Sequence, residues 1–222
     1  MFTTIQPHEV SKNIALVTEI FKLRKKVFAD QLNWDVPVNG QLEIDEYDAL
    51  DATYLVWCSN DRRTLYGVVR LMATDGPTLL HNVFGATHNN NADLISHDVW
   101  EGTRMCVDDA AIAADFPNLK PNAGFLMLLL ALCEASLDHG IRRLVSNFEP
   151  SMSRVYRKAG LSYDMHGKAD GYGARPVCCA SFEVTKPVLA KMRAALGIDL
   201  PLYRRSATAT SLVAEDALNE AA

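Results

Sequence analysis

The spacing of hydrophobic residues divides the chain into helices and strands. Apolar residues recur at near-helical intervals over residues 9–31 and 122–138, which predicts an N-terminal helix and a long buried helix. Two shorter helices are expected at 150–160, between Pro150 and Gly160, and at 186–197. Apolar runs bounded by turn residues predict strands over 53–59, 64–73, 99–107, 141–147 and 175–184.

The order of these elements predicts an α/β fold. Helical segments come first, strands follow, and strand and helix then alternate, which is typical of a mixed central β-sheet with helices on both faces. We see no internal repeat and no linker, so one domain is expected over residues 1–205. Residues 206–222 are small and polar without a packing face, and are expected to form a mobile tail.

Composition and charge narrow the class of protein. The 222 residues carry a formal net charge of −5, which argues against a global nucleic-acid-binding surface. No apolar run is long enough to span a bilayer, and the N-terminus lacks the pattern of a signal peptide, so a cytoplasmic protein is expected. The five cysteines are odd in number and lie mostly in apolar runs, which favours buried thiols. No CxxC pair or close histidine spacing predicts a metal site.

The stretch "WEGTRMC", residues 100–106, places two charges inside an apolar strand. Glu101 and Arg104 are three residues apart, so a regular strand would point them to opposite faces. A β-bulge at Gly102 would bring both charges to one face. Burying either charge alone costs several kcal/mol, so we expect ion-pair partners, and Asp45, Asp48 and Arg70 are the candidates. Purely structural ion pairs remain an alternative.

The other candidates each have an ordinary interpretation beside a functional one. Arg70 ends an apolar strand and either reaches water or joins a charged cluster. Asp45 and Asp48 belong to the acidic stretch 41–51, which is either a solvated loop or a carboxylate cluster that holds a cation. Arg24 shares a helix face with Phe28, four residues on. Trp34 lies in a proline-containing loop, as a lid or as an anchor to the core.

Taken together, these residues resemble the acyl-homoserine-lactone synthases, the LuxI-type autoinducer synthases of bacterial quorum sensing. The resemblance covers roughly residues 10–165. One position departs from the pattern, since Met105 stands where the family usually has an aromatic residue after Glu-x-x-Arg. The matching residues, in order, are Arg24, Phe28, Trp34, Asp45, Asp48, Arg70, Phe84, Glu101 and Arg104.

The resemblance implies a fold and a reaction. The fold is similar to the GNAT acetyltransferases, a twisted mixed sheet with a V-shaped cleft between two central strands. In the family reaction, the amine of S-adenosylmethionine attacks an acyl thioester. The substrate carboxylate then attacks its own γ-carbon, closes a lactone and expels 5′-methylthioadenosine. The sulfonium is already a good leaving group, so no metal or redox cofactor is expected; S-adenosylmethionine is a substrate.

The same resemblance suggests roles for the charged and aromatic residues. Glu101 is the expected base, directly or through a water, and Asp45 holds the ammonium beforehand. Arg24 or Arg104 suits the substrate carboxylate, because guanidinium binds carboxylate bidentately. Phe28 and Trp34 would pack over the sulfonium. The expected catalytic set is Glu101, Asp45, Arg104, Arg70 and Asp48.

The acyl donor in most of this family is an acyl-acyl carrier protein, which is acidic. Residues 142–158 carry five positive charges against one negative charge, Glu149, which gives a local charge of +4. This segment is the predicted docking patch, since such charge steers encounter; a solvated helix face is the alternative. Lys22, Lys25 and Lys26 would extend it. The docking residues are Arg142, Arg143, Arg154, Arg157 and Lys158.

The acyl chain is expected in an apolar tunnel. In this family, the region of Ser146 to Phe148 tunes chain length and β-carbon oxidation. A threonine that accompanies 3-oxo chains is not evident, so an unsubstituted chain is expected. The predicted lining is Met72, Phe84, Met105, Leu126, Leu130, Ser146 and Phe148.

Two other functions compete with this interpretation. An acetyl-CoA-dependent GNAT enzyme needs a glycine-rich turn before the long helix to hold the pyrophosphate. The stretch "FPNLKPNAGF" has one glycine and two prolines there, although an acyl-CoA held by other contacts stays possible. A non-catalytic ligand-binding module would be expected to lack Glu101 or Arg70, and both are present.

Overall fold

The computed structural model describes residues 1–205, so the tail predicted at 206–222 lies outside the described residues. Its centre is a seven-stranded mixed sheet in the order β1-β4-β5-β6-β7-β9-β8. A two-stranded hairpin, β2 (Val38–Asn39) and β3 (Leu42–Glu43), lies apart from it. The strands of the main sheet are β1 (Phe2–Ile5), β4 (Thr53–Cys58), β5 (Leu65–Ala73), β6 (Val99–Val107), β7 (Arg143–Phe148), β8 (Asp164–Ala169) and β9 (Val177–Glu183).

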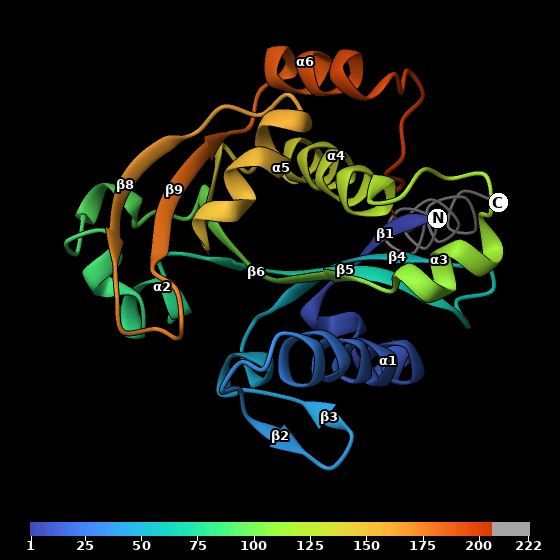
Figure 1. Ribbon diagram of the computed structural model, residues 1–222, viewed down its shortest axis with the longest axis horizontal. Coiled ribbons are helices and arrows are strands. Elements are labelled where there is room, and N and C mark those ends of the chain that lie inside the picture. Colours follow the sequence, from blue (N-terminus) through green and yellow to red (C-terminus); the bar gives the residue numbers. More distant parts are fainter. Residues whose placement is uncertain (206–222) are drawn as a thin grey trace, which may run out of the picture.

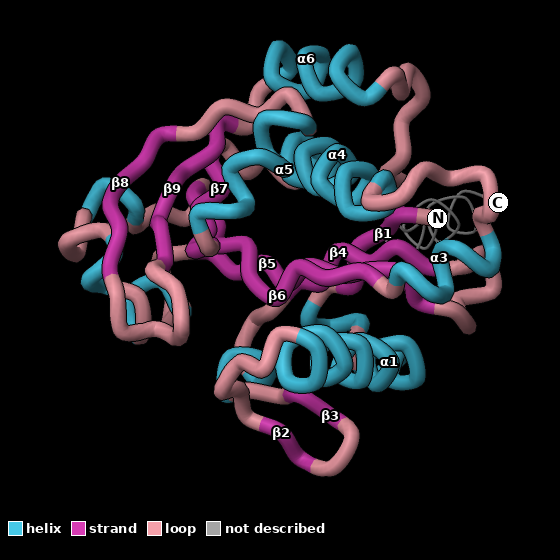
Figure 2. Tube along the Cα trace, viewed as in Figure 1, coloured by secondary structure: helices cyan, strands magenta, loops and turns pink. Residues whose placement is uncertain are grey.

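Helices cover both faces of the sheet (Figure 1). On one face lie α1 (Ile14–Arg24) and the β2–β3 hairpin; on the other lie α4 (Ala123–Asp138), α5 (Ser153–Lys158) and α6 (Lys186–Leu196). Short helices α2 (Leu79–Asn82) and α3 (Asp109–Asp115) fill connections between strands, and long loops join the rest (Figure 2). No helix within the described residues is long and apolar enough to cross a membrane.

The side chains on the two faces of β5 pack in two separate hydrophobic cores. Val69 and Leu71 pack in the core under α4, whereas Val68 and Met72 pack in the core under α1. This two-sided burial explains why β5 is a continuous apolar run without a polar face. The helix α4 is buried on nearly every side, and a leucine such as Leu128, fully buried, contributes about 1.5–3 kcal/mol to folding.

The parallel strands β6 and β7 pair over a short distance and then separate. Their register covers three residue pairs, from Val99–Arg143 to Glu101–Val145. One step further, the hydroxyl of Ser146 donates to the carbonyl of Gly102 at 3.0 Å, which replaces the ladder bond. This separation of two central strands agrees with the predicted V-shaped cleft, and Glu101 stands where the separation begins.

The predicted bulge is present in β6, but its predicted position was wrong. Val68 pairs with Cys106 and Arg70 pairs with Thr103, so two β6 residues oppose one β5 residue. The extra residue is Arg104, whose φ of 53° is in the left-handed region. Gly102, by contrast, pairs regularly with Leu71. Thr103 shares the face of Glu101 by regular alternation, and the bulge adds Arg104 to that face and turns Met105 to the α4 face.

Several element boundaries differ from those predicted. The helix expected at 9–31 is α1 flanked by short 3-10 turns and by a π-helical turn, Lys25–Gln31. The strands β1 and β8 were not predicted, since β1 has four residues and β8 lacks an alternating buried face. The helix expected at 150–160 begins as a 3-10 turn at Pro150 and continues as α5.

Candidate active site

Three arginines and three carboxylates form a buried ion-pair network between α1 and the sheet. Its first part joins α1 to the segment after β3. Arg24 donates to both oxygens of Asp48, at 2.6 and 2.9 Å, and through Nε to Glu43. Arg24 and Glu43 are fully buried, so this part of the network is shielded from solvent.

The second part joins the same segment to β5. Arg70 donates to Asp48 at 2.8 Å and binds both oxygens of Asp45, through Nη2 at 2.9 Å. Its Nε donates to the Thr103 hydroxyl at 3.1 Å, and the Tyr54 hydroxyl donates to Asp48 at 2.8 Å. Arg70 is 1% exposed, so its guanidinium lies wholly inside the protein rather than at the strand end in water.

The third part brings in β6. Arg104 donates to Glu43 at 3.0 Å and to Asp45 at 3.1 Å, and its guanidinium carbon lies 5.7 Å from the centre of the Phe28 ring. The side chain is 11% exposed, compared with 0% for Arg24. Arg104 is therefore the arginine of the network that is most accessible to a ligand.

The local sequence holds the carboxylates in place. Asp45 precedes the 3-10 turn Glu46–Ala49, where its side chain accepts a bond from the Tyr47 N–H and the Asp48 side chain accepts one from the Asp45 N–H. Burial disfavours the ionised form of Asp48, but Arg24 and Arg70 outweigh that effect and hold its pKa well below the usual value. The acidic stretch is thus a cluster that binds guanidinium groups, and only its outer members, such as Glu46 and Asp51, are exposed.

This geometry changes the role expected of Arg24. Every nitrogen of its guanidinium donates to Asp48 or Glu43, and none is exposed. Direct contact with a substrate carboxylate does not fit these contacts. Arg24 instead orders the two acids, which leaves Arg104 as the guanidinium that can reach a bound carboxylate.

Glu101 lies on the same face but outside the network. It is 1% exposed and makes no ion pair within residues 1–205. Burial raises its pKa to about 7, even though the Leu80 N–H, Arg70, Asn147 and Arg104 all act in the opposite direction. A carboxyl group with a pKa near neutrality is suited to proton transfer.

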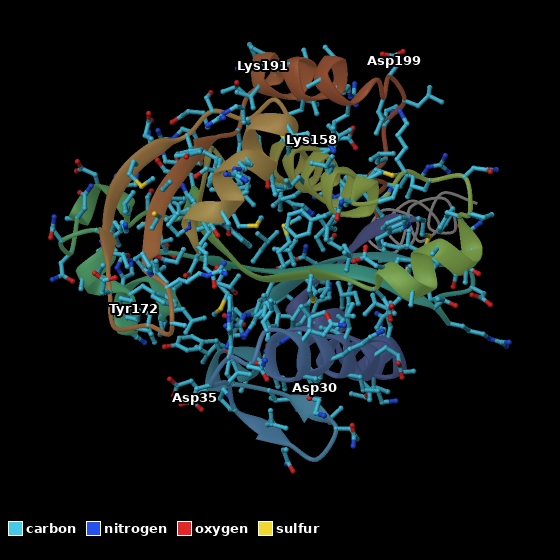
Figure 3. The ribbon with its side chains drawn as sticks, viewed as in Figure 1. Asp30, Asp35, Lys158, Tyr172, Lys191 and Asp199 are labelled. Carbon is cyan, nitrogen blue, oxygen red and sulfur yellow. The ribbon has the colours of Figure 1, made fainter. Side chains whose placement is uncertain are left out.

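The predicted aromatic pair lies beside Arg104. Phe28 is buried, whereas Trp34 is 42% exposed, and their rings stack with centres 5.1 Å apart. The π-helical turn carries Phe28, and its carbonyl accepts a bond from the Trp34 N–H at 2.9 Å. The loop with Asp35, drawn in Figure 3, follows directly. The pair therefore forms an apolar wall with one exposed ring at the edge of the charged site.

The residues predicted to line the acyl tunnel divide between the two faces of the sheet. Four of them pack in the core under α4: Met105, Leu126, Leu130 and Phe148. Met72 and Phe84 belong to the core under α1 instead. The ring of Phe84 lies 4.9 Å from that of Tyr172, in the loop after β8 labelled in Figure 3. Met72 and Phe84 therefore lie on the α1 face of the sheet, and not in a tunnel under α4.

The predicted docking patch is also divided. Arg142 pairs with Asp98 at 2.7 Å and Arg143 with Glu183 at 2.9 Å. Lys22, Lys25 and Lys26 lie on the α1 side and are each ion-paired, so they do not extend the patch. Three residues of α5 remain exposed and without an ion pair in the described part of the chain, and we call them the α5 basic face: Arg154, Arg157 and Lys158. Figure 3 shows Lys158 on the same side of the sheet as Lys191 of α6, opposite Asp30 on the α1 side.

Sequence reasoning missed three members of the site. Glu43 bridges Arg24 and Arg104, Thr103 accepts from Arg70, and Tyr54 donates to Asp48. A usable signal existed for Glu43, because it alternates with Asp45 across Ile44 in "LEID". No group of three or more His, Cys, Asp or Glu side chains in residues 1–205 is arranged to hold a metal ion.

Removing the Arg24 guanidinium should destabilise the protein strongly. Arg24→Met keeps the side-chain length but leaves Glu43 and Asp48 buried without their main donor, so we expect a loss of about 3–5 kcal/mol in the free energy of unfolding. The matched control is Lys25→Met, which removes a partly exposed ion pair with Asp30 and should cost less than about 1 kcal/mol. Urea denaturation measures both. Equal losses in the two variants would contradict the buried network.

Comparisons with known proteins agree with this geometry. The autoinducer synthase family model matches residues 8–187. An acyl-homoserine-lactone synthase of Rhizobium etli is 36% identical over 151 residues, which are 64% of this chain and 65% of that relative, just under two thirds of its length. Another, from Pseudomonas aeruginosa, is 30% identical over 68% of this chain and 74% of its own length.

Solved structures share the fold. The acyl-homoserine-lactone synthase LasI superposes with a TM-score of 0.73 at 25% identity, over 92% of this chain and 98% of its own. BjaI, described as a CoA-dependent synthase with SAM and isopentyl-CoA, superposes with a TM-score of 0.82 at 20% identity, over 98% and 99%. MesI, also described as CoA-dependent, gives 0.78 at 20% identity over 91% of this chain and 98% of its own. The GNAT-like fold prediction is confirmed, and the chain belongs to the autoinducer synthase family of acyltransferases.

Proposed function

We propose that this protein joins an acyl chain to the amine of S-adenosylmethionine and then closes the product to an acyl-homoserine lactone. The observation that carries the proposal is the placement of Glu101. It is a buried carboxyl group with a pKa of about 7, on the same sheet face as Arg104 and outside the ion-pair network. The first step needs such a group, because the attacking amine must lose a proton.

Acyl transfer is the first step. A free α-amino group has a pKa of about 7.7–8.0, so its ammonium form must be deprotonated near neutral pH. Ionised Glu101 accepts that proton, directly or through a water. The amine nitrogen then attacks the thioester carbon, an amide forms, and the C–S bond breaks to release the thiol of the donor. Asp45, which Arg70 and Arg104 hold in place, presents negative charge to the ammonium before transfer.

Orientation of S-adenosylmethionine falls to Arg104 and the aromatic pair. Arg104 keeps two bonds to Glu43 and Asp45 and still has an exposed portion, so it binds the substrate carboxylate without moving. The sulfonium lies against Phe28 and Trp34, whose rings favour a cation and exclude water. Both ends of the substrate are thereby fixed relative to Glu101.

Lactonisation is the second step and is intramolecular. A carboxylate oxygen attacks the γ-carbon, the carbon–sulfur bond breaks, and its electron pair stays on sulfur, so neutral 5′-methylthioadenosine leaves. The step gains chiefly from a folded substrate, since well-oriented groups reach effective molarities of about 10⁵ M or more. No protein nucleophile takes part, and S-adenosylmethionine acts as a substrate rather than a cofactor.

The α5 basic face supports an acyl-acyl carrier protein as the donor. Its three cations are exposed and without ion pairs in residues 1–205, in a chain whose net charge is −5. Their helix packs against the end of β7 through Tyr156, whose ring lies 5.0 Å from that of Phe148, on the α4 side with Met105, Leu126 and Leu130. An acidic carrier docked there delivers its acyl chain to that apolar core. Acyl-CoA is the alternative donor, since BjaI and MesI are CoA-dependent synthases.

The decisive test is release of 5′-methylthioadenosine. The pure protein with S-adenosylmethionine and a panel of acyl-carrier-protein and acyl-CoA donors should release it, followed by mass spectrometry. Glu101→Gln should lower kcat by about 100-fold or more, because the base is lost, with an unchanged fold by circular dichroism. The control, Glu46→Gln, changes an exposed acid of the same segment and should keep full activity. No release with any donor would refute the proposal, and full activity of Glu101→Gln would remove Glu101 as base.

The donor proposal has its own test. Arg154→Glu with Lys158→Glu reverses the α5 basic face and should raise KM for the acyl-carrier protein by about tenfold or more, since steering is lost. The value of KM for S-adenosylmethionine should stay the same. Lys12→Glu, an exposed residue away from α5, is the matched control. Equal KM values for the carrier in both variants would contradict docking at α5, and turnover of acyl-CoA alone would establish the alternative.

A further inference from the structure

Within residues 1–205, two buried polar atoms, one on Glu101 and one on Asn147, make no hydrogen bond. They are Oε1 of Glu101, an acceptor when ionised, and Nδ2 of Asn147, a donor. The Asn147 amide nevertheless acts on Glu101 as a donor would, because it lowers the pKa of the carboxyl group. Buried polar groups in native proteins almost always have partners, so this pair calls for an explanation.

The geometry of β7 directs Asn147 toward Glu101. Successive side chains of a strand alternate between faces. Ser146 pairs with Ala180 and Phe148 packs with Tyr156, both in the core under α4. Asn147 pairs with Cys179 on the other face, and the neighbouring Val145 pairs with Glu101 itself. Asn147 therefore faces away from the core under α4 and lies on the face that carries the carboxyl group.

Thr87 binds the side-chain amide of Asn147. This buried residue ends the 3-10 turn Gly85–Thr87, and its hydroxyl contacts Oδ1 of Asn147 at 2.9 Å. The turn is itself pressed against β8, since a Cβ added at Gly167 would lie 2.4 Å from the Thr87 carbonyl oxygen. Only glycine permits that approach, so Thr87 has little freedom to withdraw from the amide.

The charge of Glu101, and not the Thr87 hydroxyl, decides how the amide is oriented. The Thr87 hydroxyl has one proton, for which the carbonyl of Phe84 at 2.6 Å and Oδ1 of Asn147 at 2.9 Å compete, and its oxygen could equally accept from an amide N–H. In the orientation present, Oδ1 contacts Thr87 and Nδ2 is left to face the Glu101 side. The opposite orientation would place Oδ1 against an ionised carboxylate, where two acceptors repel. The charge of Glu101 and the orientation of Asn147 are thus coupled.

We propose that Asn147, held by Thr87, is a positioning residue that fixes Glu101 and favours its ionised form. This inference rests on the proposed function of Glu101 as the base. Asn147 touches no reacting atom and acts through the carboxylate alone. A donor aimed at the base keeps enough of it ionised at neutral pH to accept the proton of the ammonium group.

The other groups around Glu101 do not supply this effect in the same way. Arg70 of β5 and Arg104 of β6 lower its pKa through charge, but both are bound to carboxylates. From β9, the thiol of Cys179 stays neutral because burial raises its pKa to about 12. The α2 side contributes the Leu80 N–H, and the ring of His88 bonds to the Leu80 carbonyl at 3.0 Å. His81, on α2, is kept neutral by burial, which lowers its pKa.

The pH dependence of kcat/KM tests the proposal. Asn147→Leu keeps the shape but removes the donor, so the acidic limb should move up by about one pH unit, equal to about a tenfold loss below the limb. Thr87→Val keeps the Asn147 amide but removes its hydrogen bond to residue 87. The acidic limb should move in the same direction, by a smaller amount. The control is Ser181→Ala, which removes a buried hydroxyl of β9 that is bonded to His166 of β8, and it should not move the limb.

The Glu101→Gln background separates positioning from general damage. There, Asn147→Leu should cost far less activity than in the wild-type protein, because the group it acts on is gone. An unmoved limb in Asn147→Leu and Thr87→Val, or an equal loss in both backgrounds, would overturn the role of Asn147. Failure of the proposed function is a different result, since the wild-type protein itself would then release no 5′-methylthioadenosine.

Discussion

Burying charged groups on the α1 face constrains everything around them. An isolated carboxylate or guanidinium costs several kcal/mol in such an environment, so each must be paired and hydrogen-bonded. The chain meets this demand by drawing partners from α1, from the segment after β3, from β5 and from β6. A packed apolar cluster could stabilise the fold as well. We therefore attribute the network to function: it fixes the relative positions of Arg24, Glu43, Asp45, Asp48, Arg70 and Arg104.

The bulge in β6 is the backbone counterpart of this network. A non-glycine residue with φ near 53° is strained, at a cost of about 1–3 kcal/mol. The two ion pairs of Arg104 offset that cost. They form because the extra residue turns the Arg104 side chain to the face of Glu101. The following Met105 then points to the α4 face. One irregular residue thus places Arg104 on the α1 face, with Glu101, and Met105 on the α4 face.

The sequence predicted the strand 99–107, the helix 122–138 and the need for ion-pair partners, because hydrophobic period and the cost of buried charge are local properties. The bulge position was not predictable, since it depends on how β6 registers with Val68 and Arg70. Glu43 was missed because its partners are 19 and 61 residues away. The predicted docking patch included too many residues for a similar reason: Arg142 and Arg143 pair with acids that lie 44 and 40 residues away in the sequence.

Glu101 differs from the neighbouring carboxylates because it has no guanidinium partner in residues 1–205. The network pairs Glu43, Asp45 and Asp48 with guanidinium groups, whereas Glu101 is buried outside it. The direct test is to titrate the side-chain carboxyl carbon of Glu101 by ¹³C NMR in the substrate-free protein, assigned by comparison with Glu101→Gln. The account predicts a midpoint near pH 7. A midpoint near the ordinary value of 4.5 would contradict it, since such a carboxylate would be neither desolvated nor poised as a base.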